Sequence, residues 1–125
     1  MNFQKFFPSV SNCNQISYNG SMETLNTQSF KKAISEGITI IDFYAPWCGP
    51  CIGFAPVFEK FSEEFVNKAK FYKVDIDASP EIAREYAIRS IPTILAFSDG
   101  GEILRKLGAG NAIDFRIWLN KVFAL

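Results

Sequence analysis

The sequence predicts an α/β fold, in which a central mixed β-sheet of four to five strands is flanked by four helices. Apolar stretches alternate with helical patterns over residues 38–91, which predicts parallel β-α-β pairing. A turn signal at residues 99–101 joins two further apolar stretches and predicts an antiparallel hairpin. The 125 residues suffice for one domain and one core. We therefore expect a single domain over residues 23–125, with a short extra strand near residues 22–25, after an N-terminal extension over residues 1–22.

The first half of the domain contains two helical patterns around one apolar strand. Residues 26–37 read as a short amphipathic helix with Asn26 or Thr27 as cap and a glycine as stop. Residues 38–45, "ITIIDFYA", are almost entirely apolar and predict a central strand that is buried on both faces. Four phenylalanines then recur at spacings of four, three and four, which predicts a long helix that Pro56 should kink.

The second half of the domain completes the sheet and adds two more helices. Residues 69–77 predict a second strand, and Ser79 with Pro80 signals the start of a short helix. Residues 93–108 read as two strands joined at Asp-Gly-Gly. Residues 111–125 predict a last helix. Its apolar face holds Phe115, Trp118, Leu119, Val122 and Phe123.

Composition excludes several classes of function. Thirteen Lys and Arg balance thirteen Asp and Glu, so nothing indicates nucleic acid or an anionic membrane as a partner. No apolar run approaches the roughly 20 residues that a membrane-spanning helix needs. The chain has no histidine, which excludes Cys-His proteases, Ser-His-Asp hydrolases and zinc sites that use histidine.

The chain has three cysteines, Cys13, Cys48 and Cys51. A secreted disulfide scaffold usually carries more of them, in even number. Three cysteines without histidine complete a four-ligand zinc site only if a carboxylate or a second chain helps, so we expect no metal. Cys13 in the extension is either a free thiol or the site of a regulatory or intermolecular disulfide.

The Cys-X-X-Cys pair falls where a buried strand ends and a long helix begins. Free N–H groups and the helix dipole at such a position lower the pKa of a thiol, so we assign the nucleophilic attack to Cys48. Cys51 lies one turn inside the helix, where we expect it to be more buried and to act as the resolving thiol. Pro50 costs no hydrogen bond so early in a helix, and Gly49 leaves the sulfur of Cys48 open to a partner. This context favours a redox motif over a metal site.

Three further residues complete the candidate site. Asp42 lies in the apolar strand, where burial should raise its pKa and suit it to accept the proton of Cys51. Lys73, in the next strand, either partners Asp42 or is a solvated strand residue. Pro92 opens a strand, and sequence alone gives its peptide bond a cis frequency of about one in twenty.

The motif "WCGPC" at residues 47–51, with Asp42 six residues upstream and "SIPT" about forty downstream, closely resembles the thioredoxin family. The resemblance covers residues 23–125 and implies the thioredoxin fold. It implies that Cys48 is the nucleophile and Cys51 the resolving thiol, with Asp42 as the buried aspartate, Lys73 beside it and Pro92 as a cis-proline facing the disulfide. It also implies a flat apolar groove for the substrate backbone, formed by Trp47, Gly49, Pro50, Ile91, Gly108 and Ala109.

The resemblance also implies an activity. A monomeric protein-disulfide reductase would reduce target proteins such as peroxiredoxins or ribonucleotide reductase, and a thioredoxin reductase drawing on NADPH would regenerate it. It would need no bound cofactor beyond the redox-active disulfide Cys48–Cys51. We expect a cytoplasmic protein, or a mitochondrial one if residues 1–22 are a transit peptide. One departure is Ile52, since the family often has a lysine directly after the second cysteine; its loss should raise the thiolate pKa slightly and alter docking.

Three alternatives remain open at this point. A disulfide oxidase or isomerase would use the same pair of thiols, although "CGPC" argues against it. A binding module with incidental thiols is a second alternative, against which the complete set of Trp47, Cys48, Cys51, Asp42 and Pro92 argues. The third is metal or iron–sulfur binding through a dimer.

Overall fold

The computed structural model describes residues 22–125, so Cys13 and the extension up to residue 21 lie outside the described residues. The elements are, in chain order, β1 (Thr24–Leu25), α1 (Thr27–Ile34), β2 (Ile38–Tyr44), α2 (Gly49–Glu64), β3 (Lys70–Asp75), α3 (Pro80–Glu85), β4 (Thr93–Ser98), β5 (Gly101–Leu107) and α4 (Ala112–Ala124). None of the helices in this part of the chain has the length and apolar character needed to cross a membrane.

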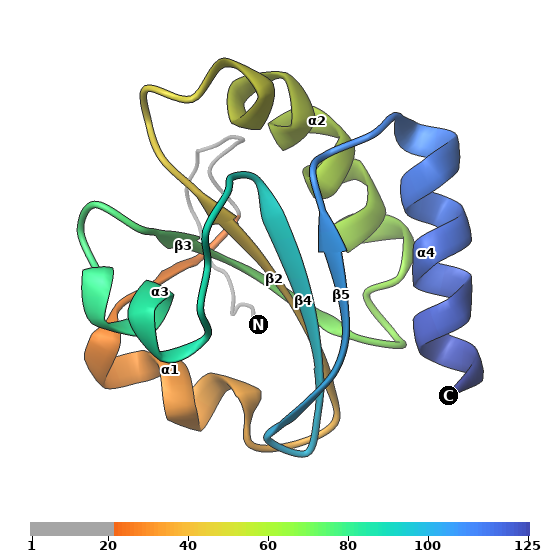
Figure 1. Ribbon diagram of the computed structural model, residues 1–125. Coiled ribbons are helices and arrows are strands. Elements are labelled where there is room, and N and C mark those ends of the chain that lie inside the picture. The colour runs from red at the N-terminus through yellow and green to blue at the C-terminus, as the bar shows by residue number, and fades with distance from the viewer. Residues whose placement is uncertain (1–21) are drawn as a thin grey trace, which may run out of the picture.

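The five strands form one mixed sheet in the order β1-β3-β2-β4-β5. The first three are parallel, because each connection between β1, β2 and β3 runs through a helix. The hairpin then adds β4, which is antiparallel to β2, and β5, which is antiparallel to β4 at the edge of the sheet. Helices α2 and α4 cover one face of the sheet, and α1 and α3 lie on the other (Figure 1). The predicted fold class and the short extra strand are confirmed.

Strand β2 is the centre of the sheet and separates two hydrophobic clusters. Its five inner residues are buried, as the apolar run predicts. Side chains alternate along a strand, so Ile40 packs into the cluster beneath α2 and α4 while Ile41 packs into the cluster beneath α1 and α3. The same alternation determines on which face of the sheet the side chains of the later residues of β2 lie.

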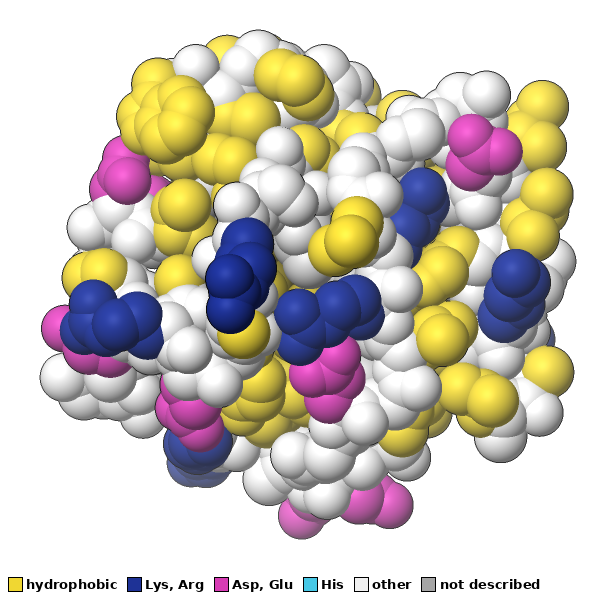
Figure 2. Space-filling view, viewed as in Figure 1, with side chains coloured by type: hydrophobic (Ala, Val, Ile, Leu, Met, Phe, Trp, Pro, Cys, Tyr) yellow, Lys and Arg dark blue, Asp and Glu magenta, His cyan; other side chains and the backbone are white. Residues whose placement is uncertain are grey.

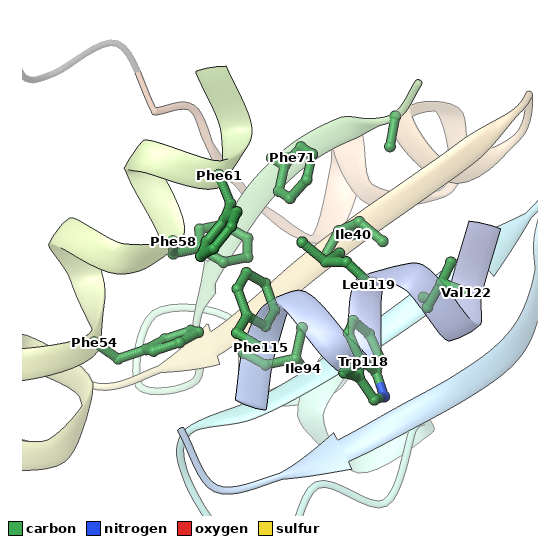
Figure 3. Close-up of a cluster of buried hydrophobic side chains, with 12 residues drawn as sticks. Ile40, Phe54, Phe58, Phe61, Phe71, Ile94, Phe115, Trp118, Leu119 and Val122 are labelled. Carbon is green, nitrogen blue, oxygen red and sulfur yellow. The ribbon is translucent and has the colours of Figure 1, made fainter. Parts of the chain in front are cut away.

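Aromatic rings fill the cluster between the sheet, α2 and α4 (Figure 3). Phe115 of α4 lies at its centre and is completely buried. Its ring centroid lies 5.1 Å from that of Phe54, 5.9 Å from Phe58 and 5.4 Å from Phe61, and it stacks on Trp118 at 5.9 Å. Tilted and edge-to-face pairs at these distances add to the gain from burial. The rings thereby hold α2, and the cysteines at its start, against the sheet.

Local signals in the sequence set most of the element boundaries. Asn26 caps α1, since its side chain accepts a hydrogen bond from the backbone N–H of Ser29 at 2.9 Å. Asp99 and Gly100 both have positive φ, as a two-residue hairpin turn of this type requires, and β5 begins at the next glycine. Ser79 precedes α3 at the predicted position, but it makes no side-chain capping bond, so the prediction of a Ser79 cap is wrong in this respect.

Candidate active site

The two cysteines lie where β2 gives way to α2. Cys48 is the N-cap residue of α2 and Cys51 lies in its first turn, which brings the two Cα atoms within 5.2 Å as a disulfide. The backbone N–H of Cys51 donates a hydrogen bond to the Cys48 sulfur at 3.2 Å. This N–H is one of the donors that a helix start leaves without a backbone partner, and after reduction it favours the thiolate of Cys48 over the thiol.

The two cysteines are buried to nearly the same extent. Cys48 is 5% exposed and Cys51 is 3% exposed, so the expected difference between them is small in the disulfide form. Their positions on the helix differ more, because Cys48 precedes the first turn and Cys51 is part of it. The dipole of the helix and its free N–H groups therefore act most strongly on Cys48.

The loop before β4 faces the disulfide. The peptide bond between Ile91 and Pro92 is cis, as the resemblance implies. The Cys48 sulfur lies 4.0 Å from the carbonyl oxygen of Ile91. The backbone N–H of Gly108 donates to the carbonyl oxygen of Pro92 at 2.9 Å, which joins the end of β5 to this loop. Residues from three separate parts of the chain are thus brought to one place.

Trp47 is the most exposed aromatic residue beside the disulfide. It is 69% exposed, and its indole N–H donates a hydrogen bond to the carboxylate of Asp77 at 2.8 Å. This bond holds the ring in one orientation while its apolar surface stays open. The contact was not predicted, although the acidic pair in "VDID" at the end of β3 was visible in the sequence.

The remaining residues of the predicted groove surround the disulfide to different degrees. Gly49 and Pro50 are exposed at the start of α2. Ile91, Gly108 and Ala109 are half-buried, and Ala109 also packs against the aromatic cluster around Phe115. Hydrophobic side chains gather over this end of the molecule, at the top of the view in Figure 2. The exposed and half-buried residues of the predicted groove therefore leave the surface beside the disulfide largely apolar.

Asp42 lies beneath this surface in the middle of β2 and is 1% exposed. It is two residues after Ile40, so its side chain is directed to the same face of the sheet, the face that α2 covers. Loss of solvation raises the pKa of its carboxyl group to about 7. Its Oδ1 atom has no hydrogen-bond partner within residues 22–125. A buried carboxyl group that titrates near neutral pH can exchange a proton with a thiol.

Lys73 is the neighbour of Asp42 in the sheet, as predicted. Their Cα atoms are paired across β2 and β3, and the positive charge of Lys73 pulls the pKa of Asp42 partly back down. The two side chains form no ion pair in the described part of the chain; the Lys73 ammonium instead lies 4.4 Å from the centre of the Tyr44 ring. The direct partnership that the sequence left open is therefore not found.

The described residues contain no group of three or more Cys, Asp or Glu side chains that could hold a metal ion. The groups of the site that can exchange electrons or protons include its two sulfur atoms and the buried carboxyl group of Asp42. A pair of thiols at a helix N-terminus can reduce a second disulfide by exchange and become a disulfide in its turn.

Comparison with known proteins places the chain in a family. The family model named Thioredoxin matches residues 21–121. A thioredoxin of Bacillus subtilis is 44% identical over 81 residues, which cover 65% of this chain and 78% of that protein. A thioredoxin of Rickettsia felis is 41% identical over 95 residues, 74% of this chain and 90% of that protein. A chloroplastic M-type thioredoxin of Pisum sativum is 42% identical over 63% of this chain and 47% of its own length. The chain therefore belongs to the thioredoxin family of thiol-disulfide oxidoreductases.

Proposed function

We propose that the protein reduces disulfides in target proteins and that Cys48 begins the reaction. The thiolate of Cys48 attacks one sulfur of the target disulfide, a mixed disulfide forms, and the other target sulfur leaves as a thiolate that takes up a proton. Support comes from the place of Cys48 at the start of α2 and from the hydrogen bond that the Cys51 N–H donates to its sulfur.

Cys51 completes the exchange in the second step. Asp42 accepts the proton of Cys51, the resulting thiolate attacks the sulfur of Cys48, and the target leaves as its second thiolate. The two electrons of the dithiol have then passed to the target, and the disulfide Cys48–Cys51 remains. A pKa of about 7 for Asp42 supports this role, because a base works best when its pKa lies near the working pH. Lys73 adjusts that pKa through its charge.

The target backbone docks over the disulfide in the groove described above. Trp47 and Pro50 form one side, and Ile91 with cis-Pro92 forms the other. The Ile91 carbonyl oxygen lies next to the Cys48 sulfur, so a strand placed along this loop would carry its own sulfur close to Cys48. Gly108 and Ala109 extend the groove beyond Pro92.

The oxidised protein must be reduced again to act repeatedly. We infer that a thioredoxin reductase supplies the electrons from NADPH and that the targets are proteins such as peroxiredoxins or ribonucleotide reductase. This activity requires a reducing compartment, either the cytoplasm or the mitochondrial matrix. Residues 23–125 would act as one domain, with residues 1–22 as an extension to it.

The place of Cys48 as the N-cap of α2, with the Cys51 N–H donating a hydrogen bond to its sulfur, is the observation that carries this proposal. Reduction of insulin disulfides tests it, first with dithiothreitol and then with NADPH and a thioredoxin reductase. Wild type should accelerate reduction in both assays, and Cys48→Ser should abolish the acceleration. Folded wild type with no activity above background would refute reduction as its function. Activity with dithiothreitol but not with reductase would refute only the electron pathway.

A further inference from the structure

Ile52 is an exposed apolar residue directly beside the reactive disulfide. It follows Cys51 in the chain and is 62% exposed. Its backbone N–H donates to the carbonyl oxygen of Cys48 at 3.0 Å, which is the first hydrogen bond of α2. Residues four apart lie on the same side of a helix, so Ile52 lies one turn along the helix from Cys48. Single exposed apolar residues are ordinary on protein surfaces, but this one adjoins the reacting atoms.

The surrounding part of α2 carries no charge. Residues 49–58, "GPCIGFAPVF", contain no acidic or basic side chain, and the first charged residue of the helix is Glu59. The exposed residues of this stretch are Gly49, Pro50, Ile52, Gly53 and Pro56. None of them bears a polar side chain, and Ile52 is the largest. On this helix, therefore, a bound chain meets an uncharged apolar surface for more than two turns.

The reaction determines what must lie against this surface. When Cys48 forms a mixed disulfide, the target sulfur is covalently attached to the start of α2. The residues next to the target cysteine must then pack close to the first turn of the helix, where Ile52 is the accessible side chain. An apolar target side chain gains by burial against Ile52. A charged one loses water there, and the first ten residues of α2 offer it no charged side chain as a partner.

We propose that Ile52 is a specificity-determining residue that favours target proteins with apolar, uncharged side chains beside their reactive cysteine. The proposal rests on the proposed function, since it concerns the choice of target by the same site. Ile52 extends the apolar surface of Trp47 to the α2 side of the disulfide. It contributes contact area to the protein target and takes no part in the transfer of electrons.

Two disulfide-linked peptides test the proposal. They are identical except that one carries Leu and the other Glu next to the cysteine that is attacked. The second-order rate constant is measured with the reduced protein by following peptide thiols. Wild type should reduce the Leu peptide about tenfold faster than the Glu peptide. In Ile52→Gln, a neutral change that leaves the charge near the thiolates unaltered, this preference should fall to roughly twofold or less.

Three controls separate docking from chemistry. Hydroxyethyl disulfide is small and uncharged and has no side chain to pack against Ile52, so wild type and Ile52→Gln should reduce it at the same rate. Ile52→Val should retain the preference for the Leu peptide. Val66→Gln changes a residue that is 67% exposed just beyond the far end of α2 and should alter none of the rates.

The possible failures are distinguishable. If Ile52→Gln keeps the wild-type preference, or slows hydroxyethyl disulfide as much as the Leu peptide, the role of Ile52 in target choice is refuted while the proposed function holds. If wild type reduces neither of the two peptides nor insulin, the proposed function itself is refuted, and the inference with it.

Discussion

Asp42 and Lys73 are paired across β2 and β3, yet their charges are not joined in an ion pair. The Lys73 ammonium lies over the Tyr44 ring, and Oδ1 of Asp42 has no hydrogen-bond partner within residues 22–125. Burial without full compensation makes the charged carboxylate unfavourable, which is why the pKa of Asp42 rises to about 7. The protein thus keeps a destabilising group in its core, on the face of the sheet that α2 and α4 cover.

This burial predicts how stability depends on pH. The pKa of Asp42 is raised from 3.8 in an unfolded chain to about 7 in the folded one. This difference in pKa therefore does not destabilise the fold below about pH 4, and it destabilises the fold increasingly as pH rises towards 7. Asp42→Asn should therefore become more stable relative to oxidised wild type as pH rises. The difference between their free energies of unfolding should change by roughly 2 to 4 kcal/mol in favour of the variant between pH 4 and pH 8. Denaturant unfolding at a series of pH values measures this difference.

The direction of the effect is the critical outcome. A difference that stays constant from pH 4 to pH 8 would mean that Asp42 does not titrate in this range. A difference that shrinks with rising pH would mean that its pKa is lowered rather than raised. Glu36→Gln, at an exposed position between α1 and β2, serves as a control for the removal of one carboxylate.

The same pKa predicts the pH dependence of target release. Below pH 7 Asp42 is mostly protonated and cannot accept the proton of Cys51, so the rate of the second step should fall as pH falls through about 7. Asp42→Asn should lose this dependence and be slower than wild type at pH 8 by at least roughly tenfold. Rapid quenching of a preformed mixed disulfide measures the rate of release.

A comparison in the absence of Cys51 isolates the first step. Formation of the mixed disulfide should differ little between Cys51→Ser and the double variant Asp42→Asn, Cys51→Ser, because Asp42 acts on the second thiol. Superimposable pH profiles of target release for wild type and Asp42→Asn would count against the role of Asp42 as the proton acceptor.

The aromatic cluster predicts where the fold is most sensitive to truncation. Phe115 is fully buried and contacts rings from α2 and α4. Phe115→Ala should lower the free energy of unfolding by about 3 to 5 kcal/mol, because it removes apolar area and leaves a cavity. Ile113→Ala, on the same helix but 70% exposed, should change stability by no more than about 0.5 kcal/mol. Urea unfolding of the two variants checks both values, and equal effects would contradict the packing described.

Much of the fold was predictable because several signals agreed. The largely apolar run of β2, the spacing of the phenylalanines in α2 and the Asp-Gly turn each predict one structural element. Burial of Asp42 was predictable too, since its neighbours in the strand are apolar on both sides. These features depend on residues close together in the chain.

Features that depend on tertiary contacts were not predictable in the same way. The position of Lys73 beside Asp42 was predicted correctly. Its ammonium group nevertheless lies over the Tyr44 ring, and the periodicity of the sequence does not predict this contact. Trp47 finds its partner in Asp77, thirty residues further along the chain. Ser79 has the right residue type for a cap, but its side chain makes no capping bond to α3.

The most direct test of the dithiol mechanism is the capture of a target by single-cysteine variants. Reduced Cys51→Ser is mixed with a disulfide-containing protein such as insulin, and adducts are identified by mass spectrometry without reductant. If Cys48 attacks and Cys51 resolves, Cys51→Ser should accumulate a mixed disulfide through Cys48, and Cys48→Ser should accumulate little or none under the same conditions. Adducts that form mainly through Cys51, or equally through both residues, would contradict the assignment of roles to the two cysteines.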